Sequence, residues 1–226
     1  MNALKGITAI TATTLALVAS SCSDNDEPSL SVFQNIVTYM GNSSDGARFE
    51  FQEADDSPIV SLGVKARVKE DKVKPGERLL MLYSLPSGFS YGQNCSEVKL
   101  LGLQSVYTDT ITPLPHSDAT TKKNPIYIST IYRSGHYLNI TAKMPVTANR
   151  TYSLVADDST LDNGDVHAYL TSDSDDDKPT FNETQTASID ISPVWSMPQT
   201  KSLTVHFNNT NNKYLTSVTF TKNNIN

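Results

Sequence analysis

A serine framed by glycines is the first group in this sequence that could do chemistry. Gly88, Ser90 and Gly92 fit the G-x-S-x-G pattern of a nucleophile elbow, in which a sharp strand-to-helix turn presents the serine to a histidine. The residues that follow, QNCSEVKLLGLQ, continue with the composition of a strand, and the chain shows no alternation of strands and helices. A glycine-bounded hairpin loop is the favoured interpretation, and a hydrolase is the least favoured function.

The histidines and acidic residues do not form a metal-binding pattern. The four histidines are scattered, with no HxH or HExxH pairing. Asp173, Asp175 and Asp177 alternate as in a calcium loop, but Lys178 stands where an EF-hand needs glycine. Residues 157–165 hold a second acidic cluster. Solvated turns are the default interpretation of both clusters, with weak calcium binding as the alternative, and the sequence predicts no catalytic residue, metal or cofactor.

Two single residues could still contact a ligand or react. Trp195 lies between Pro193 and Pro198, where an exposed ring would be a speculative ligand contact able to stack on a sugar. Packing of the tryptophan onto a sheet edge is the favoured alternative. Cys95 has no histidine or basic cluster around it in the sequence, so we expect a buried or inert thiol.

The N-terminal segment indicates where the protein is positioned. Residues 1–21 combine Lys5, a short apolar run and the small residues 19–21, which are the parts of a secretory signal peptide. The run is too short and too rich in threonine to span a bilayer. With Cys22 next, the segment resembles a bacterial lipobox, which implies that Cys22 is lipidated and is the first residue of the mature chain. Simple secretion is the alternative.

An acidic string directly after Cys22 forms part of a tether over residues 22–30. Like charges in a row solvate and repel one another, so no folded element is expected there. The string resembles the export signal that takes Bacteroidetes lipoproteins to the extracellular side of the outer membrane, and a plain hydrophilic spacer is the alternative. It consists of Ser23, Asp24, Asn25, Asp26 and Glu27.

The charge balance limits the partners. The formal net charge is −6, with 18 Lys+Arg against 24 Asp+Glu, so the chain lacks the basic field that nucleic-acid binding requires. The expected partners are the membrane, through the lipid anchor, and a protein or oligosaccharide ligand of unknown identity. The oligomeric state is left open.

Alternation of apolar and polar residues predicts an all-β fold. Residues 136–144 place Leu138, Ile140, Ala142 and Met144 on one face of a strand. Residues 79–83 are apolar on both faces, which indicates a central strand. A phase slip beside Gly102 predicts a β-bulge. Residues 113–125, bounded by prolines, are predicted to link a domain at residues 31–112 to a second at residues 126–226.

Three stretches in order carry a family resemblance. The chain resembles the NigD-like lipoproteins of Bacteroidetes in the composition and the order of its predicted strands. The stretches that carry this resemblance are GERLLMLYSLPSG, VKLLGLQSVYTDTIT and NPIYISTIYRSGHYLNI. Family members often carry a tryptophan where this chain has Tyr132. The resemblance implies an N-terminal OB-like small barrel, a C-terminal β-sandwich, and a non-catalytic binding or interaction module with a bacteriocin-associated or immunity-type role. An accessory glycan-binding lipoprotein is the alternative.

Overall fold

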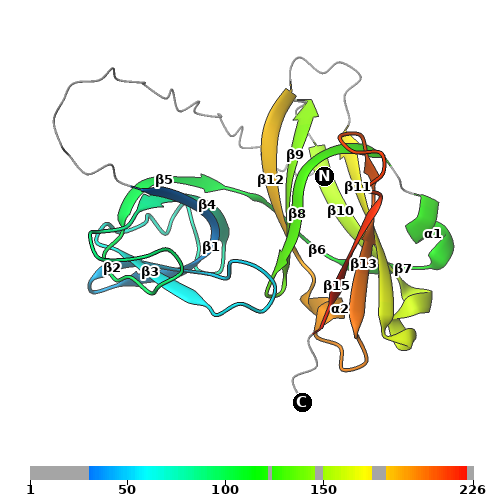
Figure 1. Ribbon diagram of the computed structural model, residues 1–226, viewed down its shortest axis with the longest axis horizontal. Coiled ribbons are helices and arrows are strands. Elements are labelled where there is room, and N and C mark those ends of the chain that lie inside the picture. The colour runs from blue at the N-terminus through cyan, green and yellow to red at the C-terminus, as the bar shows by residue number, and fades with distance from the viewer. Residues whose placement is uncertain (1–30, 122–123, 146–149, 175–181, 223–226) are drawn as a thin grey trace, which may run out of the picture.

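The computed structural model describes residues 31–121, 124–145, 150–174 and 182–222 (Figure 1). The first domain is a strongly curved sheet with the strand order β3-β2-β1-β4-β5. Its strands are antiparallel neighbours, and apolar side chains alternate along them because successive residues of a strand point to opposite faces. The strands are β1 (Val32–Ser43), β2 (Gly46–Phe51), β3 (Val60–Val64), β4 (Arg78–Ser84) and β5 (Lys99–Ser105).

Hydrogen bonds outside the named strands join the two ends of this sheet. The segment that leads into β5 runs parallel to β3, with a bridge between Leu62 and Cys95. The amide of Gly63 donates to the Cys95 carbonyl over 2.7 Å, and the amide of Val98 donates to the Gly63 carbonyl over 2.8 Å. The sheet therefore curls back on itself in the order expected of an OB-like barrel. Cys95 is 3% exposed, which confirms the prediction of a buried cysteine.

The predicted bulge is present in β5. Leu82 pairs with Gly102 and Tyr83 pairs with Leu100, so Leu101 is the extra residue between them. A bulge bends its strand and increases the local twist, which helps a five-stranded sheet to curve. The central-strand prediction for residues 79–83 is also confirmed, because β4 lies between β1 and β5.

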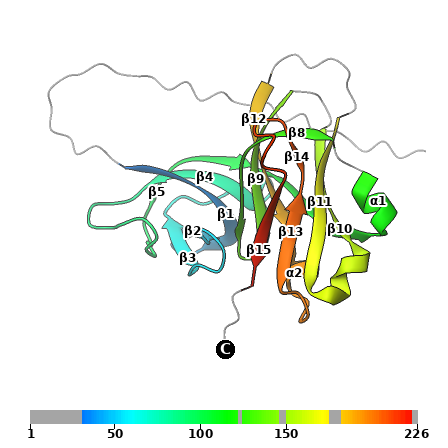
Figure 2. The same ribbon diagram turned by 45° about the vertical axis from the view of Figure 1, so that its right-hand side comes forward.

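The second domain is a sandwich of two five-stranded sheets in the described residues (Figure 2). One sheet has the order β14-β8-β9-β12-β6, and the other has the order β15-β13-β11-β10-β7. The first comprises β6 (Tyr107–Thr110), β8 (Pro125–Ser134), β9 (Tyr137–Pro145), β12 (Asn182–Asp190) and β14 (Asn208–Asn209). The second comprises β7 (Thr112–Leu114), β10 (Arg150–Asp157), β11 (Asp165–Ser174), β13 (Ser202–His206) and β15 (Ser217–Thr221).

The faces that meet between the two sheets form the core of the sandwich. Leu138, Ile140 and Ala142 of β9 are at most 1% exposed, so the alternation predicted for residues 136–144 is confirmed for them. The facing sheet supplies Val166, Ala168 and Leu170 from β11 in the same alternation. The described residues also form three short helices outside the sheets: α1 (His116–Thr121), the 3-10 helix η1 (Asp158–Asn163) and α2 (Ser192–Trp195). None of the helices in the described ranges is both long and apolar enough to cross a bilayer.

The predicted linker at residues 113–125 is wrong. The sandwich begins earlier, with β6 pairing in parallel with β12 and β7 pairing in parallel with β10, and α1 follows directly. The prolines suggested an unstructured segment, but Pro113 lies in β7 at the edge of its sheet, where a missing amide hydrogen is tolerated. Ile111, between the two strands, is 2% exposed and anchors the crossing from one sheet to the other.

Candidate functional site

The two domains meet along one face of each. The outer face of β1, β4 and β5 in the barrel lies against the outer face of β8, β9 and β12 in the sandwich (Figure 1). A cleft of about 380 Å³ opens beside this contact. None of its lining residues is charged, so hydroxyl and amide groups supply its polarity. The lining consists of Gln34, Ile36, Leu80, Gln104, Ser105, Val106, Tyr132, Thr141, Thr184 and Thr186.

Arg78 of the barrel anchors one side of the junction. Its side chain is buried at 6% exposure, and its Nε donates to Ser188 Oγ of β12 over 3.1 Å. Its terminal nitrogens donate to Thr38 Oγ1 over 3.0 Å and to Asn139 Oδ1 over 3.4 Å. The guanidinium carbon lies 4.2 Å from the centroid of the Tyr137 ring. Burial lowers the pKa of Arg78, because all these partners are neutral and desolvation disfavours the charge.

Arg133 of the sandwich reaches in the opposite direction, to the barrel. Its two terminal nitrogens donate to the two carboxylate oxygens of Asp56 over 2.8 and 2.9 Å, which is a bidentate pair. Its guanidinium carbon lies 4.5 Å from the centroid of the Trp195 ring. The hydrogen bonds from Arg133 hold the pKa of Asp56 below its usual range. Asp55 completes the contact through its backbone, since its amide donates to the Arg133 carbonyl over 2.7 Å.

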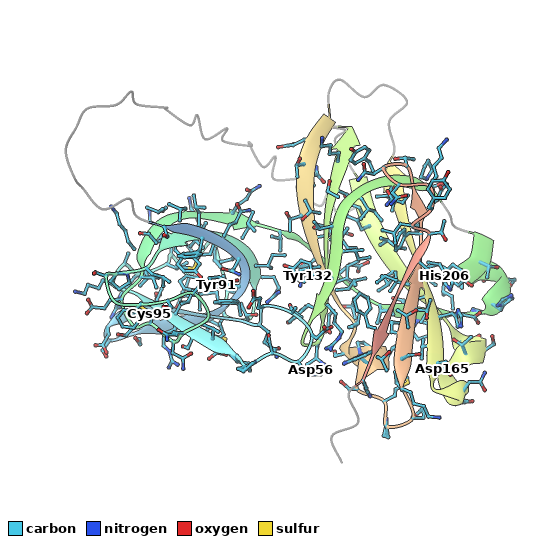
Figure 3. All side chains as sticks on the ribbon, viewed as in Figure 1. Asp56, Tyr91, Cys95, Tyr132, Asp165 and His206 are labelled. Atoms are coloured by element: carbon cyan, nitrogen blue, oxygen red, sulfur yellow. The ribbon has the colours of Figure 1, made fainter. Side chains whose placement is uncertain are left out.

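Tyr132 lies at the centre of the junction (Figure 3). It lines the cleft and also a second hollow of about 330 Å³ between β8, β15 and the loop that carries Asp55. Burial raises the pKa of the Tyr132 phenol, so the hydroxyl stays protonated near neutral pH and can donate or accept a hydrogen bond. This is the position at which the family resemblance leads one to expect a tryptophan, so a planar ring is retained there.

The speculative ligand contact at Trp195 is wrong. The side chain is 4% exposed and belongs to the sandwich core. The proline-flanked segment forms the short helix α2, with Pro193 in its first turn, and this turn directs the ring inward. Arg133 and Lys222 then cover the ring, with the Lys222 ammonium nitrogen 5.6 Å from its centroid. The packing role that the sequence favoured is the one observed.

The serine motif is not assembled for catalysis in the described part of the chain. Ser90 is exposed in a turn of the barrel, and Gly88 and Gly92 adopt positive φ angles of 89° and 82°. No helix follows the serine, and the segment continues into β5, as the loop interpretation required. All four histidines belong to the sandwich domain, whereas Ser90 belongs to the barrel.

The acidic clusters serve local structure where they are described. Asp157 is buried and caps η1 by accepting from the amide and hydroxyl of Ser159. Burial alone would raise the pKa of Asp157, but its hydrogen bonds with Ser159 and His116 lower it. Asp165 accepts from the Ser202 hydroxyl over 2.8 Å. Among the residues that the structure describes, no group of three or more His, Cys, Asp or Glu could hold a metal ion. Asp175 and Asp177 lie outside the described residues.

Sequence reasoning missed the two junction arginines and the pairing of two histidines. It did not find Arg78 and Arg133, because a charged residue in a strand is expected to face water. It also treated His167 and His206 as unrelated, although β11 and β13 bring them together. Their phase, opposite to that of their apolar neighbours, was the available signal. Cys22 and the string Ser23, Asp24, Asn25, Asp26 and Glu27 lie outside the described residues, so their assignments stay predictions.

The fold and junction define a two-domain all-β protein in which an OB-like barrel is joined to a β-sandwich. The model of the NigD-like C-terminal beta sandwich domain matches residues 109–221, half of the chain, and the chain belongs to the NigD-like family. The match begins inside β6, in agreement with the early start of the sandwich. No curated protein sequence matches the chain.

Solved structures from the Bacteroidetes share the whole arrangement. A protein of unknown function, DUF1344, from Bacteroides vulgatus is 17% identical, with a TM-score of 0.62 over 85% of this chain and 90% of its own. A NigD-like immunity protein from Bacteroides caccae is 18% identical, with a TM-score of 0.54 over 86% and 93%. A candidate lipoprotein from Bacteroides fragilis is 10% identical, with a TM-score of 0.55 over 85% and 96%. At these identities the likeness concerns the fold alone.

Proposed function

We propose that this NigD-like protein is a lipid-anchored, non-catalytic binding protein of the outer membrane that faces the extracellular side and captures a protein partner in the interdomain cleft. The observation that carries the proposal is the uncharged cleft held between two domains by reciprocal buried arginine contacts. Because the walls belong to two docked domains, the cleft is preorganised, and preorganisation reduces the entropic cost of binding.

The role that fits such a site is of the immunity type. The relative from Bacteroides caccae is named a NigD-like immunity protein. For this chain we propose that such a role consists of binding another protein without catalysing a reaction. A cleft lined by Thr, Gln and Ser with Ile36, Leu80 and Tyr132 offers hydrogen-bonding groups and apolar contacts to a protein surface. Because its lining is uncharged, we expect binding there to depend little on salt.

Anchoring rests on Cys22 and the tether after it. Val32, at the start of β1, lies ten positions after Cys22, and an extended chain over ten residue steps spans about 33 Å. The barrel can therefore stand clear of the lipid headgroups. Two or more acyl chains give stable attachment without a membrane-spanning helix.

Mass spectrometry of the N-terminal peptide tests the anchor. We expect a diacylglyceryl group on the Cys22 sulfur, and an unmodified cysteine in protein released into the medium would refute the anchor. Surface display is tested by protease treatment of intact cells. The wild-type protein should be cleaved, whereas the triple variant Asp24→Asn, Asp26→Asn, Glu27→Gln should be protected. Equal cleavage of both would leave the acidic string as a plain spacer.

Capture of a partner is tested by placing a charge in the cleft. Thr184→Lys introduces an ammonium group among uncharged lining residues, and Ser87→Lys adds the same charge to an exposed loop of the barrel. A protein that co-purifies with the wild-type chain from detergent-solubilised cells should be lost with Thr184→Lys and retained with Ser87→Lys. Retention with both variants would exclude the cleft as the binding site.

Glycan binding is the second candidate, favoured by the Tyr132 ring beside the hydroxyl and amide groups of the cleft. Sugar rings present CH faces that pack on an aromatic ring, and their hydroxyls pair with such groups. Affinity electrophoresis on a panel of polysaccharides gives the test. Retardation that is lost in Tyr132→Ala would support a glycan ligand, and migration unaffected by every polysaccharide would remove this candidate.

A further inference from the structure

The two sheets of the sandwich leave a gap along one side of the domain. β15 is the outermost strand of its sheet, and in the described residues β8 has only the two-residue strand β14 beyond it. Both strands line the second hollow, of about 330 Å³, together with the barrel loop that carries Asp55 (Figure 2). We call this hollow between β8, β15 and Asp55 the seam.

The outer edge of β15 presents backbone groups to the seam. Directly after this strand, the Lys222 amide donates to the Lys201 carbonyl over 2.8 Å, which continues the pairing with β13. Residues of an antiparallel strand alternate between those that bond one neighbour and those that face away from it. Thr219 and Thr221 therefore direct their amides and carbonyls away from β13. Both residues are exposed, and both line the seam.

The edge of β8 is covered on either side of the seam but not within it. Asparagine side chains of residues 209–211 bond the amide and the carbonyl of Ile128 over 3.2 and 3.0 Å. Further along, the Arg133 carbonyl accepts from the Asp55 amide over 2.7 Å. Ile131 lies between these points, two residues before Arg133, so its backbone groups face the same way. Within the described ranges, no other strand pairs with them.

The dimensions of a sandwich suit one added strand at this place. Packed sheets lie about 10 Å apart, and neighbouring strands of one sheet lie about 4.8 Å apart. A strand inserted between the edges of two packed sheets is thus about one strand spacing from each. The floor of the seam is apolar, because Phe220 belongs to the sandwich core and Ile131 packs against that core. Alternate residues of an added strand can therefore place apolar side chains inward.

Asp55 gives the seam a surplus of negative charge. The Arg133 guanidinium is 1% exposed and already has a bidentate bond to Asp56. Asp55 adds a second carboxylate 3.4 Å from the same guanidinium, and its side chain is 65% exposed. Lys222, which follows β15, is engaged with the Met197 carbonyl over 2.9 Å. A basic side chain that enters the seam therefore meets an accessible carboxylate.

We propose that the seam binds an extended peptide segment of a protein partner by strand addition to β15, with a lysine or arginine of the segment at Asp55. Backbone hydrogen bonds to Thr219, Thr221 and Ile131 give affinity, whereas the apolar floor and the carboxylate select the sequence. The seam is separate from the interdomain cleft, although Tyr132 borders both. The proposal holds whether or not the cleft binds a protein.

A display library of short random peptides, selected against the purified mature chain, supplies the probe. We expect the enriched peptides to alternate apolar and polar residues and to contain Lys or Arg. Amide exchange followed by NMR locates the contact: the bound peptide should slow exchange at Thr219 and Thr221, whereas Val218 and Phe220 already face β13 and should not change. Selection of no peptide, or protection confined to other residues, would overturn the proposal.

A second copy of the chain is the competing occupant, because a free strand edge can pair with itself. Exchange at Thr219 and Thr221 that slows with rising protein concentration, in the absence of peptide, would assign the seam to a dimer and refute peptide binding. Exchange that is independent of protein concentration supports the proposal.

A proline at the edge tests strand addition directly. Thr219→Pro removes an amide hydrogen that faces away from β13, so the pairs within the sheet are kept, and edge strands tolerate proline. The affinity for a selected peptide should fall by about tenfold. The matched control Thr219→Ser keeps the amide and the hydroxyl that bonds Thr204, and it should bind as the wild type does. Equal affinity of both variants would exclude pairing at this edge.

Removal of the carboxylate tests the preference for a basic residue. Asp55 has a φ angle of 46°, which asparagine tolerates, so Asp55→Asn keeps the loop. Its affinity for a lysine-containing peptide should fall several-fold and depend less on salt, whereas Asp45→Asn in an exposed turn should change neither. The cleft variant Thr184→Lys should bind the peptide normally, which separates this site from the cleft. Loss of the peptide in Thr184→Lys alone would move its site to the cleft and refute the proposal.

Discussion

Both domains insert a buried arginine into the junction, but the two guanidinium groups have different kinds of partner. Arg78 belongs to the barrel and inserts among neutral groups of the sandwich, whereas Arg133 belongs to the sandwich and binds the carboxylate of Asp56 in the barrel. Both guanidinium groups lie over an aromatic ring, Tyr137 in one case and Trp195 in the other. The difference teaches that the charge of the partners, and not burial alone, sets how each contact responds to pH.

Removal of Arg133 should have the largest effect. Arg133→Ala takes away a fully buried side chain, the bidentate bond to Asp56 and the cation over Trp195. We expect the free energy of unfolding to fall by about 3 kcal/mol. Urea denaturation followed by tryptophan fluorescence measures it, since Trp195 is the single tryptophan. The exposed Arg67→Ala control should stay within about 0.5 kcal/mol of the wild type, and a similar result for Arg133→Ala would contradict this account.

Removal of Arg78 should cost less. In Arg78→Ala, Ser188 still donates to Asn139 Oδ1 over 2.8 Å and Asn139 still donates to Ser134 Oγ over 2.8 Å. Ser188 and Asn139 therefore keep hydrogen-bond partners, and we expect a loss of about 2 kcal/mol in the same urea experiment. Because the partners of Arg78 do not titrate in acid, the loss should be equal at pH 7 and below pH 4. A loss that shrinks in acid would erase the distinction between the two arginines.

Gly135 lies near Arg133 in the sandwich and faces Gln52 of the barrel, so it also tests how tightly the two domains pack. Gly135 adopts a φ angle of +55°, and a Cβ atom built on it would lie 2.1 Å from Gln52 Oε1 of the barrel. Gly135→Ala should lower the free energy of unfolding by about 1–2 kcal/mol, through the left-handed backbone and this clash. The double variant Gln52→Ala, Gly135→Ala should recover the part due to the clash. If the double variant recovers nothing, backbone strain accounts for the whole loss.

The smallest expected effect is the loss of charge at Asp56. Asp56→Asn keeps the shape of the side chain, and the Asp56 side chain is 48% exposed, so we expect a loss of about 1 kcal/mol at pH 7. The pKa of Asp56 is lowered in the folded state by Arg133, so its contribution is present above the unfolded value of about 4 and disappears as the pH falls through the folded value. Wild type and variant should therefore converge in acid, and parallel pH profiles would argue against the carboxylate pair.

The parts of the fold that follow from local pattern were predictable. Alternation identified the buried face of β9, and the phase slip beside Gly102 identified the bulge in β5. The start of the sandwich was not predictable, because β6 and β7 are short edge strands whose partners lie far away in the sequence. The site was less accessible still: Arg78 and Arg133 are buried only because the two domains dock, and no periodicity within one strand reports docking.

The crossing at Ile111 has a consequence for the order in which the chain can fold. Within the part of the chain that the structure describes, strands β1 to β5 of the barrel pair in a single sheet, and the last of them ends at Ser105. On either side of Ile111, β6 must wait for β12 and β7 must wait for β10, and such non-local pairings are slow to form. The barrel can therefore finish its sheet during synthesis or export while the sandwich is still open. Arg78 cannot reach its partner in β12 until Ser188 has been made, so docking of the domains must follow completion of the barrel sheet.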